Sequence, residues 1–572
     1  MDVDAAVFGT GLSESVAAAA LSKAGFSVVH IDANAYYGGN DASLTFDELI
    51  QWAHERTTPS EDKEPTYISV QKQRYTSISR SSETLPQSRQ YSFSLSPTVI
   101  PSLGPLIDSL VTSGVSRYGG FKLLERLGMF DRPGVVRSVP SSKEDVFKSR
   151  ELSLVDKRRL MRFLVFAAGQ FEGTMELTGR ENTPFFGFLR DIFSLDERTA
   201  SSVAFGLALC VSVQDPTLPA LQRLRRYSKS VGRYGPSAFL VGHYGGVGEV
   251  AQGFCRTSAV SGGTYILGRR LLSITQLPSQ GRTEKFKEVG RKYAIELEEF
   301  PERLTCDMII SSPDYIPSEL SSHASAVPPP LSSTSGTPTD MYPVARCIAV
   351  IDSPIRFLAT GPSPETRTSG DTSSDEQAPQ EKGATGEVDT AMLIFAPSSV
   401  SGGSTTSAAH MLVTGEGSMS APSGRWIVYL SRHLLHEDEK TSSAEELLKP
   451  YLNATMSLIA PSISEEGSAL PIQPIFTLFF IQNPLSAPPA SDAASTILVP
   501  PPVTSLVSEL ADAATENAEQ VFWKAAQTIT SARAERKPQG GEGKGETPKD
   551  IEVDSFWPPL DVIDDEPTLE EW

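Results

Sequence analysis

The sequence predicts an α/β protein in which a sheet domain is interrupted by an all-helical domain. Three observations lead to this fold class. The 572-residue chain begins with a compact strand–helix–strand unit, short apolar runs return late in the chain, and a helical hydrophobic period lies between them. Short apolar runs bounded by Ser, Gly or Pro indicate strands, and an apolar stripe at helical spacing indicates packed helices.

The opening unit contains the glycine-rich stretch FGTGLSES at residues 8–15. The strand AAVFG precedes it, a helix is expected over 12–24, and the strand SVVHID follows. Gly9 and Gly11 match the first two positions of G-x-G-x-x-G, the turn that holds a dinucleotide pyrophosphate, and Asp32 stands where an acid would bind ribose hydroxyls. These features predict an FAD/NAD(P)-binding-like fold.

Glu14 occupies the position of the third glycine in this motif. A glycine there lets the helix N-terminus approach the strand and the phosphates. A glutamate adds bulk, and a negative charge where the pyrophosphate would gather amide donors. We therefore expect the fold without its dinucleotide site, with Gly9, Gly11 and Glu14 forming a vestigial loop and no cofactor bound.

The later strands and the central helices divide the chain into domains. Strands are expected at DMIISS (307–312), RCIAVIDSP (346–354), TAMLIFAP (390–397), RWIVYLS (425–431) and PIFTLFFIQ (474–482). In the middle, one helix is expected after the cap Ser153, a second from Ser194 and a third after Pro219. The sheet domain is thus predicted at 1–139 and 233–532, and the helical domain at 140–232.

Several polar stretches are predicted to be disordered insertions, because they have too few apolar residues to offset the entropy of ordering. They lie near 55–90, 316–340, 361–387, 399–424 and 486–503. Residues 533–572 are predicted to form a disordered acidic tail.

Composition excludes several classes of protein. The net charge of −20 disfavours nucleic-acid binding. Four scattered cysteines form no CxxC pair, which indicates a reducing compartment and no disulfide framework. No leader or membrane-spanning run is evident, so we expect a cytosolic protein. His433 and His436 lie in HLLHEDE without a further ligand set, and no catalytic motif is found, so neither a metal site nor an enzyme is expected.

A glycine-dense stretch, residues 231–270, carries a candidate binding face. Glu249, Gln252 and Arg256 lie at i, i+3 and i+7, which places them on one face of a helix. This face is interpreted either as a solvated surface or as a polar recognition platform. The residue spacing leaves both interpretations open.

Several blocks, in this order, resemble the family of Rab escort proteins and Rab GDP-dissociation inhibitors. They are GTGLSES with HIDANAYYGG, SRYGGFKLLE, GRYG with YGGVGEVAQGF, CRTSAVSGGTYIL, IISSPDY and ARCIAVIDSPI. The stretch VPSSKEDVFKSRELSLVDKRRLMRFLVF and the long insertions are more similar to the escort branch. The chain departs from the family at Val250 and Ala251, where Leu-Pro is usual, and at Ile266, where inhibitors often have Met.

The resemblance implies a flavoprotein-like fold that binds no FAD. It implies that the sheet domain binds a GDP-bound Rab GTPase, and that the helical domain contacts the geranylgeranyl lipid and the α/β heterodimer of Rab geranylgeranyltransferase. The residues it assigns to the Rab-binding platform are Tyr37, Glu249, Gln252, Arg256 and Thr264. Those it assigns to the C-terminal tail of the Rab are Arg233, Ser237 and Phe239.

The function implied by the resemblance is a non-catalytic escort component that presents Rab for geranylgeranylation and carries it to membranes, which it touches transiently. One alternative is a Rab GDP-dissociation inhibitor that recycles prenylated Rabs. A more distant alternative is an FAD-dependent oxidoreductase. The three alternatives differ in whether unmodified Rab becomes a prenylation substrate and in whether flavin is bound.

Overall fold

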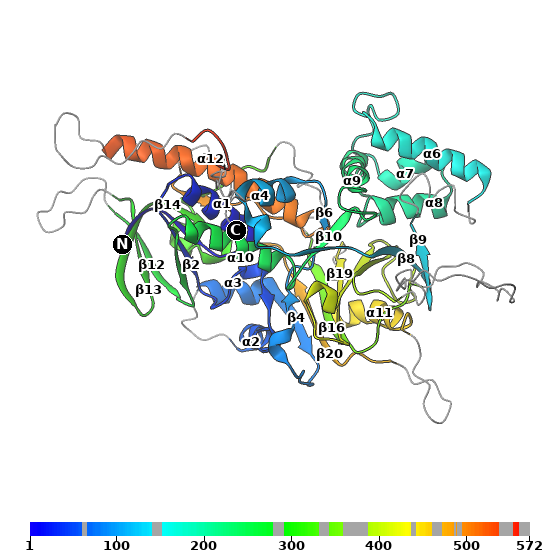
Figure 1. Cartoon of the computed structure of the whole chain (residues 1–572), viewed down its shortest axis with the longest axis horizontal. Helices are drawn as coiled ribbons and strands as arrows, with labels where there is room; N and C mark the ends of the chain where they lie inside the picture. Colours follow the sequence, from blue (N-terminus) through cyan, green and yellow to red (C-terminus); the bar gives the residue numbers. More distant parts are fainter. Residues whose placement is uncertain are drawn as a thin grey trace, which may run out of the picture.

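The computed structural model describes residues 1–59, 66–139, 152–277, 291–330, 342–357, 387–435, 442–459, 472–485, 488, 495–536 and 553–559. In these parts of the chain the strands form two large sheets and two small ones. A group of helices stands apart at one end of the molecule, beside the second large sheet (Figure 1). Helices cover both large sheets.

The first large sheet begins with the strand that leads into the glycine loop. Strand β1 lies parallel between β2 and β14, with Ala6 opposite both Val29 and Ile309. All residues of β1 after the first are buried, as expected for a parallel strand covered on both faces. The strands are β1 (Asp2–Phe8), β2 (Val28–Asp32), β11 (Thr264–Leu267), β12 (Leu271–Gln276), β13 (Tyr293–Leu297), β14 (Phe300–Ser311), β15 (Ala324–Ala326) and β21 (Ile497–Val499).

The second large sheet is antiparallel except where β17 runs parallel to β8. At its centre, Cys347 of β16 is paired with Leu430 of β19 and Phe479 of β20. The runs at 346–354, 390–397, 425–431 and 474–482 therefore form strands of a separate sheet instead of extending the first. The strand order is β4 (Tyr75–Arg80), β20 (Phe476–Gln482), β16 (Val344–Ile351), β19 (Trp426–His433), β18 (Ala409–Thr414), β17 (Ala391–Phe395), β8 (Arg126–Arg132) and β9 (Val135–Ser138).

Helices and two small sheets complete this part of the molecule. The alanine-rich α1 packs between α10 and α12, because its short side chains are buried on all sides and allow close approach. The helices are α1 (Leu12–Lys23), α2 (Phe46–Thr57), α3 (Thr66–Arg74), α4 (Pro105–Ser113), α10 (Val247–Val260), α11 (Ala444–Met456) and α12 (Leu510–Arg536). The small sheets are β6 (Ile100–Pro101), β10 (Phe239–Gly242) and β7 (Phe121–Leu123), and β3 (Ser43–Leu44) with β5 (Phe93–Ser94).

The separate helical domain contains α6 (Leu154–Ala168), α7 (Phe185–Asp191), α8 (Glu197–Ser201) with a π-helical turn (Ser202–Leu207), and α9 (Thr217–Ser230). The Ser153 side chain caps α6 as expected. The second helix begins later than expected, because Asp196 is its cap and Ser194 has a φ of +53°. The third begins earlier, since Pro219 fits within its first turn.

Several stretches that were expected to be disordered insertions contribute buried residues instead. Range 55–90 supplies α3, β4 and the buried side chains of Tyr67, Tyr75 and Leu85. Range 399–424 supplies β18. The prediction is wrong for these parts because long-range strand pairing orders polar segments, as when β4 adds to β20.

Two further ranges are ordered in part. Range 316–340 supplies β15, and 486–503 supplies β21, whose three residues are all buried. Almost all of 361–387 lies outside the described residues.

The predicted disordered tail also needs correction. Helix α12 continues to Arg536, and residues 553–559 lie against the helices that cover the first sheet, where Val553, Phe556 and Trp557 pack on buried side chains. Residues 537–552 and 560–572 lie outside the described part of the chain.

Candidate functional site

The glycine loop connects β1 to α1, as expected for a dinucleotide-binding unit. Glu14 lies in the first turn of α1. A Cβ atom added to Gly11 would be only 2.7 Å from the Glu14 carboxylate. Its side chain therefore fills the space beside the loop that a bound pyrophosphate would need.

The charge of Glu14 differs from the sequence-based expectation. The residue is only 8% exposed, and burial raises the pKa of its carboxyl to about 8. Near neutral pH the carboxyl therefore holds a proton, since its pKa lies above the pH of the medium. The bulk of Glu14 occupies the site, while the negative charge expected from the sequence is largely absent.

Two amide groups of the loop, at Thr10 and Leu12, already have partners within the chain. Thr10 donates its N–H and its hydroxyl to Asp32 Oδ2, at 2.8 and 2.6 Å. The first amide of α1, at Leu12, donates to Asp41 Oδ2 at 3.1 Å. Asp41 Oδ2 therefore takes the place at this helix N-terminus that a phosphate oxygen would otherwise occupy.

Asp32, the expected ribose-binding acid, is also fully engaged. Its Oδ1 accepts hydrogen bonds from the Asn34 amide and side chain, each at 2.8 Å, and from the Tyr315 hydroxyl at 2.7 Å. The Thr10 and Leu12 amides and the acid that would bind ribose are thus bonded to the protein itself. The residues present do not fit a bound dinucleotide.

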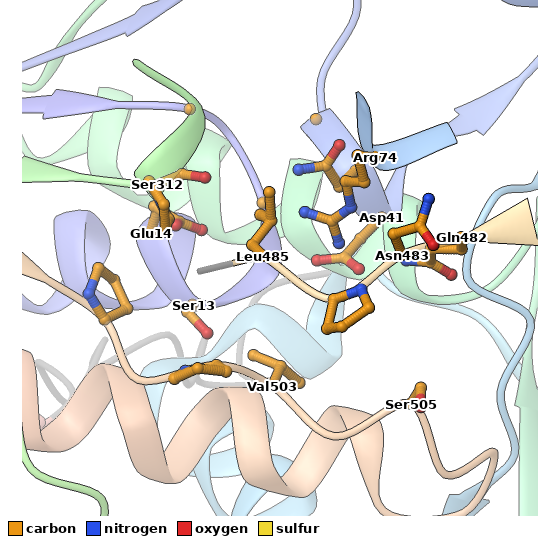
Figure 2. Close-up of a pocket in the computed structure, with 18 of the residues that line it drawn as sticks. Ser13, Glu14, Asp41, Arg74, Ser312, Gln482, Asn483, Leu485, Val503 and Ser505 are labelled. Carbon is orange, nitrogen blue, oxygen red and sulfur yellow. The ribbon is translucent and has the colours of Figure 1, made fainter. Parts of the chain in front are cut away.

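A small cavity remains beside the loop. Figure 2 shows Glu14 on one side of it and Asp41 and Arg74 on the other. Its volume is about 140 Å³, whereas ligand pockets usually measure about 300–1,000 Å³. The cavity is too small for FAD.

Helix α10 carries the candidate binding face. Gln252 and Arg256 are exposed and Glu249 is half-buried, while Phe254 and Cys255 point into the core. Burial raises the pKa of Glu249. The structure therefore places the three polar residues on one accessible face, as their spacing indicated.

Tyr37 and Thr264 lie beside this helix on neighbouring loops and strands. Tyr37 follows β2 and packs edge-on against Tyr265, with ring centroids 5.9 Å apart. Thr264 begins β11, which pairs with β2. Tyr265 was not singled out from the sequence, although it links Tyr37 to the His30 side chain at 3.3 Å.

Tyr118 is a second residue that sequence reasoning did not single out. The guanidinium of Arg256 lies 4.5 Å from the centroid of its ring, and the ring is 51% exposed. The cation–π contact holds the arginine over an aromatic face. The signal available in the sequence was the block SRYGGFKLLE, in which Tyr118 sits beside two glycines.

The three residues that the resemblance assigns to the Rab tail differ in their exposure to solvent. Arg233 is exposed over the ring of Tyr234, and Ser237 is half-buried. Phe239 is 3% exposed and packs edge-on against Tyr227. The expectation for the Phe239 side chain needs correction, because a side chain buried in the core is not available to a partner.

Metal clusters and membrane-spanning helices are both absent from the described part of the chain. Across the described residues, no group of three or more His, Cys, Asp or Glu side chains could hold a metal ion. His433 is buried against Ser505, and His436 lies outside the described residues. No helix in the described part of the chain is long and apolar enough to span a bilayer.

The fold and site together define a class: a flavoprotein-like protein whose dinucleotide site is closed by its own side chains. The model of the GDP dissociation inhibitor family matches residues 1–328, and the chain belongs to this family. A Rab GDI structure from Plasmodium falciparum is similar in fold, with a TM-score of 0.58, 18% identity, and coverage of 92% of this chain and 98% of that one. This likeness confirms the predicted fold class.

Several relatives carry the name Rab proteins geranylgeranyltransferase component A, among them one from yeast and one from fly. The Saccharomyces cerevisiae protein is 28% identical over 429 residues, which cover 75% of this chain and 61% of that protein. The Drosophila melanogaster protein is 33% identical over 315 residues, which cover 50% of this chain and 58% of that protein. The chain therefore matches less than two thirds of the length of these relatives.

Proposed function

We propose that this chain is a Rab escort protein, a non-catalytic component that binds GDP-bound Rab and presents it to a geranylgeranyltransferase. One observation carries this proposal: the loop that closes the dinucleotide site, residues 37–41, also holds Tyr37, which packs against Tyr265 in the strand that directly follows α10. The scaffold of a cofactor site is thus used to build a surface for a protein partner. The name shared by the relatives supports the same role.

In this proposal the platform for the globular part of the Rab contains Tyr37, Glu249, Gln252, Arg256 and Thr264. Arg256 and Gln252 are accessible, and Arg256 is held over Tyr118. Preference for GDP would follow from contact with Rab segments that change order with the bound nucleotide. Arg233 and Ser237 would guide the flexible Rab tail toward the transferase.

The helical domain is proposed to meet the transferase and the lipid. Several of its apolar side chains are exposed: Leu154 (85%), Val155 (57%), Val165 (58%) and Met175 (89%). A geranylgeranyl chain has about 20 carbons, and each CH₂ removed from water contributes on the order of 0.8 kcal/mol, so the attached lipid requires an apolar surface. Catalysis would remain in the partner α/β heterodimer.

In this role the protein would work in the cytosol and touch membranes only transiently. An apolar site that binds the lipid tightly keeps the lipidated Rab in solution. Transfer of the Rab to a membrane therefore requires a competitor that binds the Rab in place of this chain. The membrane contact would therefore be brief.

A second candidate function is that of a Rab GDP-dissociation inhibitor, which the name of the matching family model favours. Both functions require binding to GDP-bound Rab. They differ in that an escort protein makes unmodified Rab a substrate of the purified heterodimer, whereas an inhibitor acts on Rab that is already prenylated. A flavin-dependent oxidoreductase is disfavoured, because the Thr10 and Leu12 amides and Asp32 are bonded within the chain.

A binding titration tests the shared part of the proposal. Unprenylated Rab is loaded with GDP or with a non-hydrolysable GTP analogue and titrated with the full chain by calorimetry. We expect tighter binding of the GDP form. Equal affinity for the two forms, or no binding to either, would contradict the proposal.

A further inference from the structure

An aromatic segment near the end of the described chain, residues 553–559, lies against three helices that cover the first sheet. Trp557 stacks on Phe254 of α10, with centroids 5.7 Å apart and an interplanar angle of 23°. Phe556 packs edge-on against Phe522 of α12, at 5.2 Å. The partner rings Phe254 and Phe522 are fully buried.

Trp557 also bonds to a third helix. Its indole N–H donates to the Ser109 hydroxyl of α4 at 3.2 Å. One side chain therefore joins α4 to α10 through a hydrogen bond and a ring stack. Figure 1 shows α4 and α12 side by side above the first sheet, and the two helices are in contact.

Helix α10 also contacts the turn that follows α4, at the candidate binding face. Tyr118 follows α4 and the 3₁₀ turn Val115–Arg117, and its ring lies under Arg256 of α10. Val115 approaches so near that a Cβ added to Gly253 would be 2.9 Å from it, so a glycine allows this close packing. Arg256 and Phe254 are two residues apart, which directs them to nearly opposite sides of the helix.

The segment is held by the aromatic contacts described. Ordering residues 553–559 costs conformational entropy, and the ring contacts with Phe254 and Phe522 offset that cost. Removing the two aromatic side chains would expose Phe254 and Phe522 and would leave Ser109 without this bond. The spacing of α4 and α10 would then depend on fewer contacts.

We propose that Trp557, supported by Phe556, is a positioning residue that fixes the spacing of α4 and α10 and thereby the placement of Arg256 over Tyr118. The C-terminal segment then controls affinity for the partner from behind the binding face, without touching the partner. This inference rests on the proposed function, because it takes a GDP-loaded Rab GTPase as the partner that the α10 face binds.

The test compares four full-length proteins by titration with GDP-loaded, unprenylated Rab: wild type, Trp557→Ala, Trp557→Phe and Trp523→Ala. We expect Trp557→Ala to weaken binding about five- to tenfold, as for a side chain that supports an interface contact. Trp557→Phe keeps the stack but loses the indole hydrogen bond to Ser109, so we expect a smaller loss of about two- to threefold. Trp523 of α12 is 37% exposed and serves as the matched tryptophan control, with unchanged affinity expected.

A double-mutant cycle separates positioning from general destabilisation. If Trp557 acts through the Tyr118–Arg256 contact, Trp557→Ala should have little further effect in a Tyr118→Leu background. Fully additive losses would overturn the proposal, as would wild-type affinity of Trp557→Ala. If Trp557→Ala does not fold, Ser109→Ala removes only the indole hydrogen bond, and an affinity loss of about two- to threefold is expected, whereas none would overturn the proposal.

A parallel titration of Arg256→Ala tells the two proposals apart. Weaker binding by Arg256→Ala together with unchanged binding by Trp557→Ala would contradict only the positioning inference. Unchanged binding by Arg256→Ala would remove the α10 face from the proposed function itself.

Discussion

The guanidinium of Arg256 lies over the ring of Tyr118, 4.5 Å from its centroid, and both side chains face solvent. This contact joins helix α10 to the turn after α4. It leaves the arginine pre-oriented, so less side-chain entropy is lost when a partner carboxylate or carbonyl binds it. An exposed, oriented arginine is typical of an interface hot spot.

The Arg256→Ala substitution should weaken binding to GDP-loaded Rab by about 1–3 kcal/mol, the usual cost of losing a charged hydrogen bond at an interface. Calorimetry measures this directly. Arg303→Ala, at an exposed position on β14, is the control and should bind like the wild type. Equal affinities for Arg256→Ala and the wild type would exclude Arg256 from the platform.

The raised pKa of Glu14 predicts a pH dependence of stability. The carboxyl has an ordinary pKa of 4.5 and a pKa of about 8 in the folded protein. Between these values the folded state binds more protons than the unfolded state, so this group makes the free energy of unfolding fall as pH rises. Glu14→Gln removes the titration, and denaturant unfolding at several pH values should show a shallower decline.

The matched control for this series is Glu319→Gln, at an exposed carboxyl. It should keep the wild-type pH dependence. A Glu14→Gln protein whose stability falls as steeply as that of the wild type over the same pH interval would contradict the assignment.

Restoring the glycine motif should not restore a cofactor. Glu14→Gly removes the bulk beside Gly11, but the Thr10 and Leu12 amides remain bonded to Asp32 and Asp41. After incubation with FAD and gel filtration, the variant should show no flavin absorbance. Stoichiometric flavin in the eluted protein would show that Glu14 alone closes the site.

A buried ion-pair cluster joins the helical domain to α12 and predicts a large loss of stability. Arg226 of α9 pairs with Glu509 and with Asp512, the latter at 3.2 Å, and both carboxylate side chains are 3% exposed. Burial raises the pKa of Asp512 to about 7. Arg226→Met removes the cation that is paired with these two buried carboxylates and should lower the free energy of unfolding in urea by about 2–4 kcal/mol. This is less than for a fully buried pair, because the Arg226 side chain is 23% exposed.

The neighbouring Arg225→Met is the control for this cluster. Arg225 pairs with the exposed Glu172 and lies over Phe171. Its loss should cost at most about 1–2 kcal/mol. Similar losses for the two variants would show that the buried cluster contributes no more than a surface pair.

The sequence predicted those features whose signal is local. The glycine loop with Asp32 indicated the strand–helix–strand unit, the cap Ser153 marked the start of α6, and the i, i+3, i+7 spacing placed Glu249, Gln252 and Arg256 on one face. Each of these depends on residues within one helix turn or one strand–helix–strand unit. Such patterns are set by helix and strand periodicity.

The features that were missed depend on contacts between distant residues. Segment β4 is polar, and it is ordered by pairing with β20, about four hundred residues later. Asp41 satisfies the Leu12 amide, and Tyr118 supports Arg256, across long stretches of chain. Composition averages over a segment and does not reveal that one aromatic residue, such as Trp557, meets a buried partner.

Transfer of geranylgeranyl to unmodified Rab tests the central proposal most directly. Purified α/β heterodimer, geranylgeranyl diphosphate and GDP-loaded Rab are incubated with and without this chain, and lipid incorporation is measured. An escort protein should make the reaction proceed, and Arg256→Ala should require a higher concentration of the chain for the same rate. No stimulation by a folded, Rab-binding chain would contradict the escort function and favour the inhibitor.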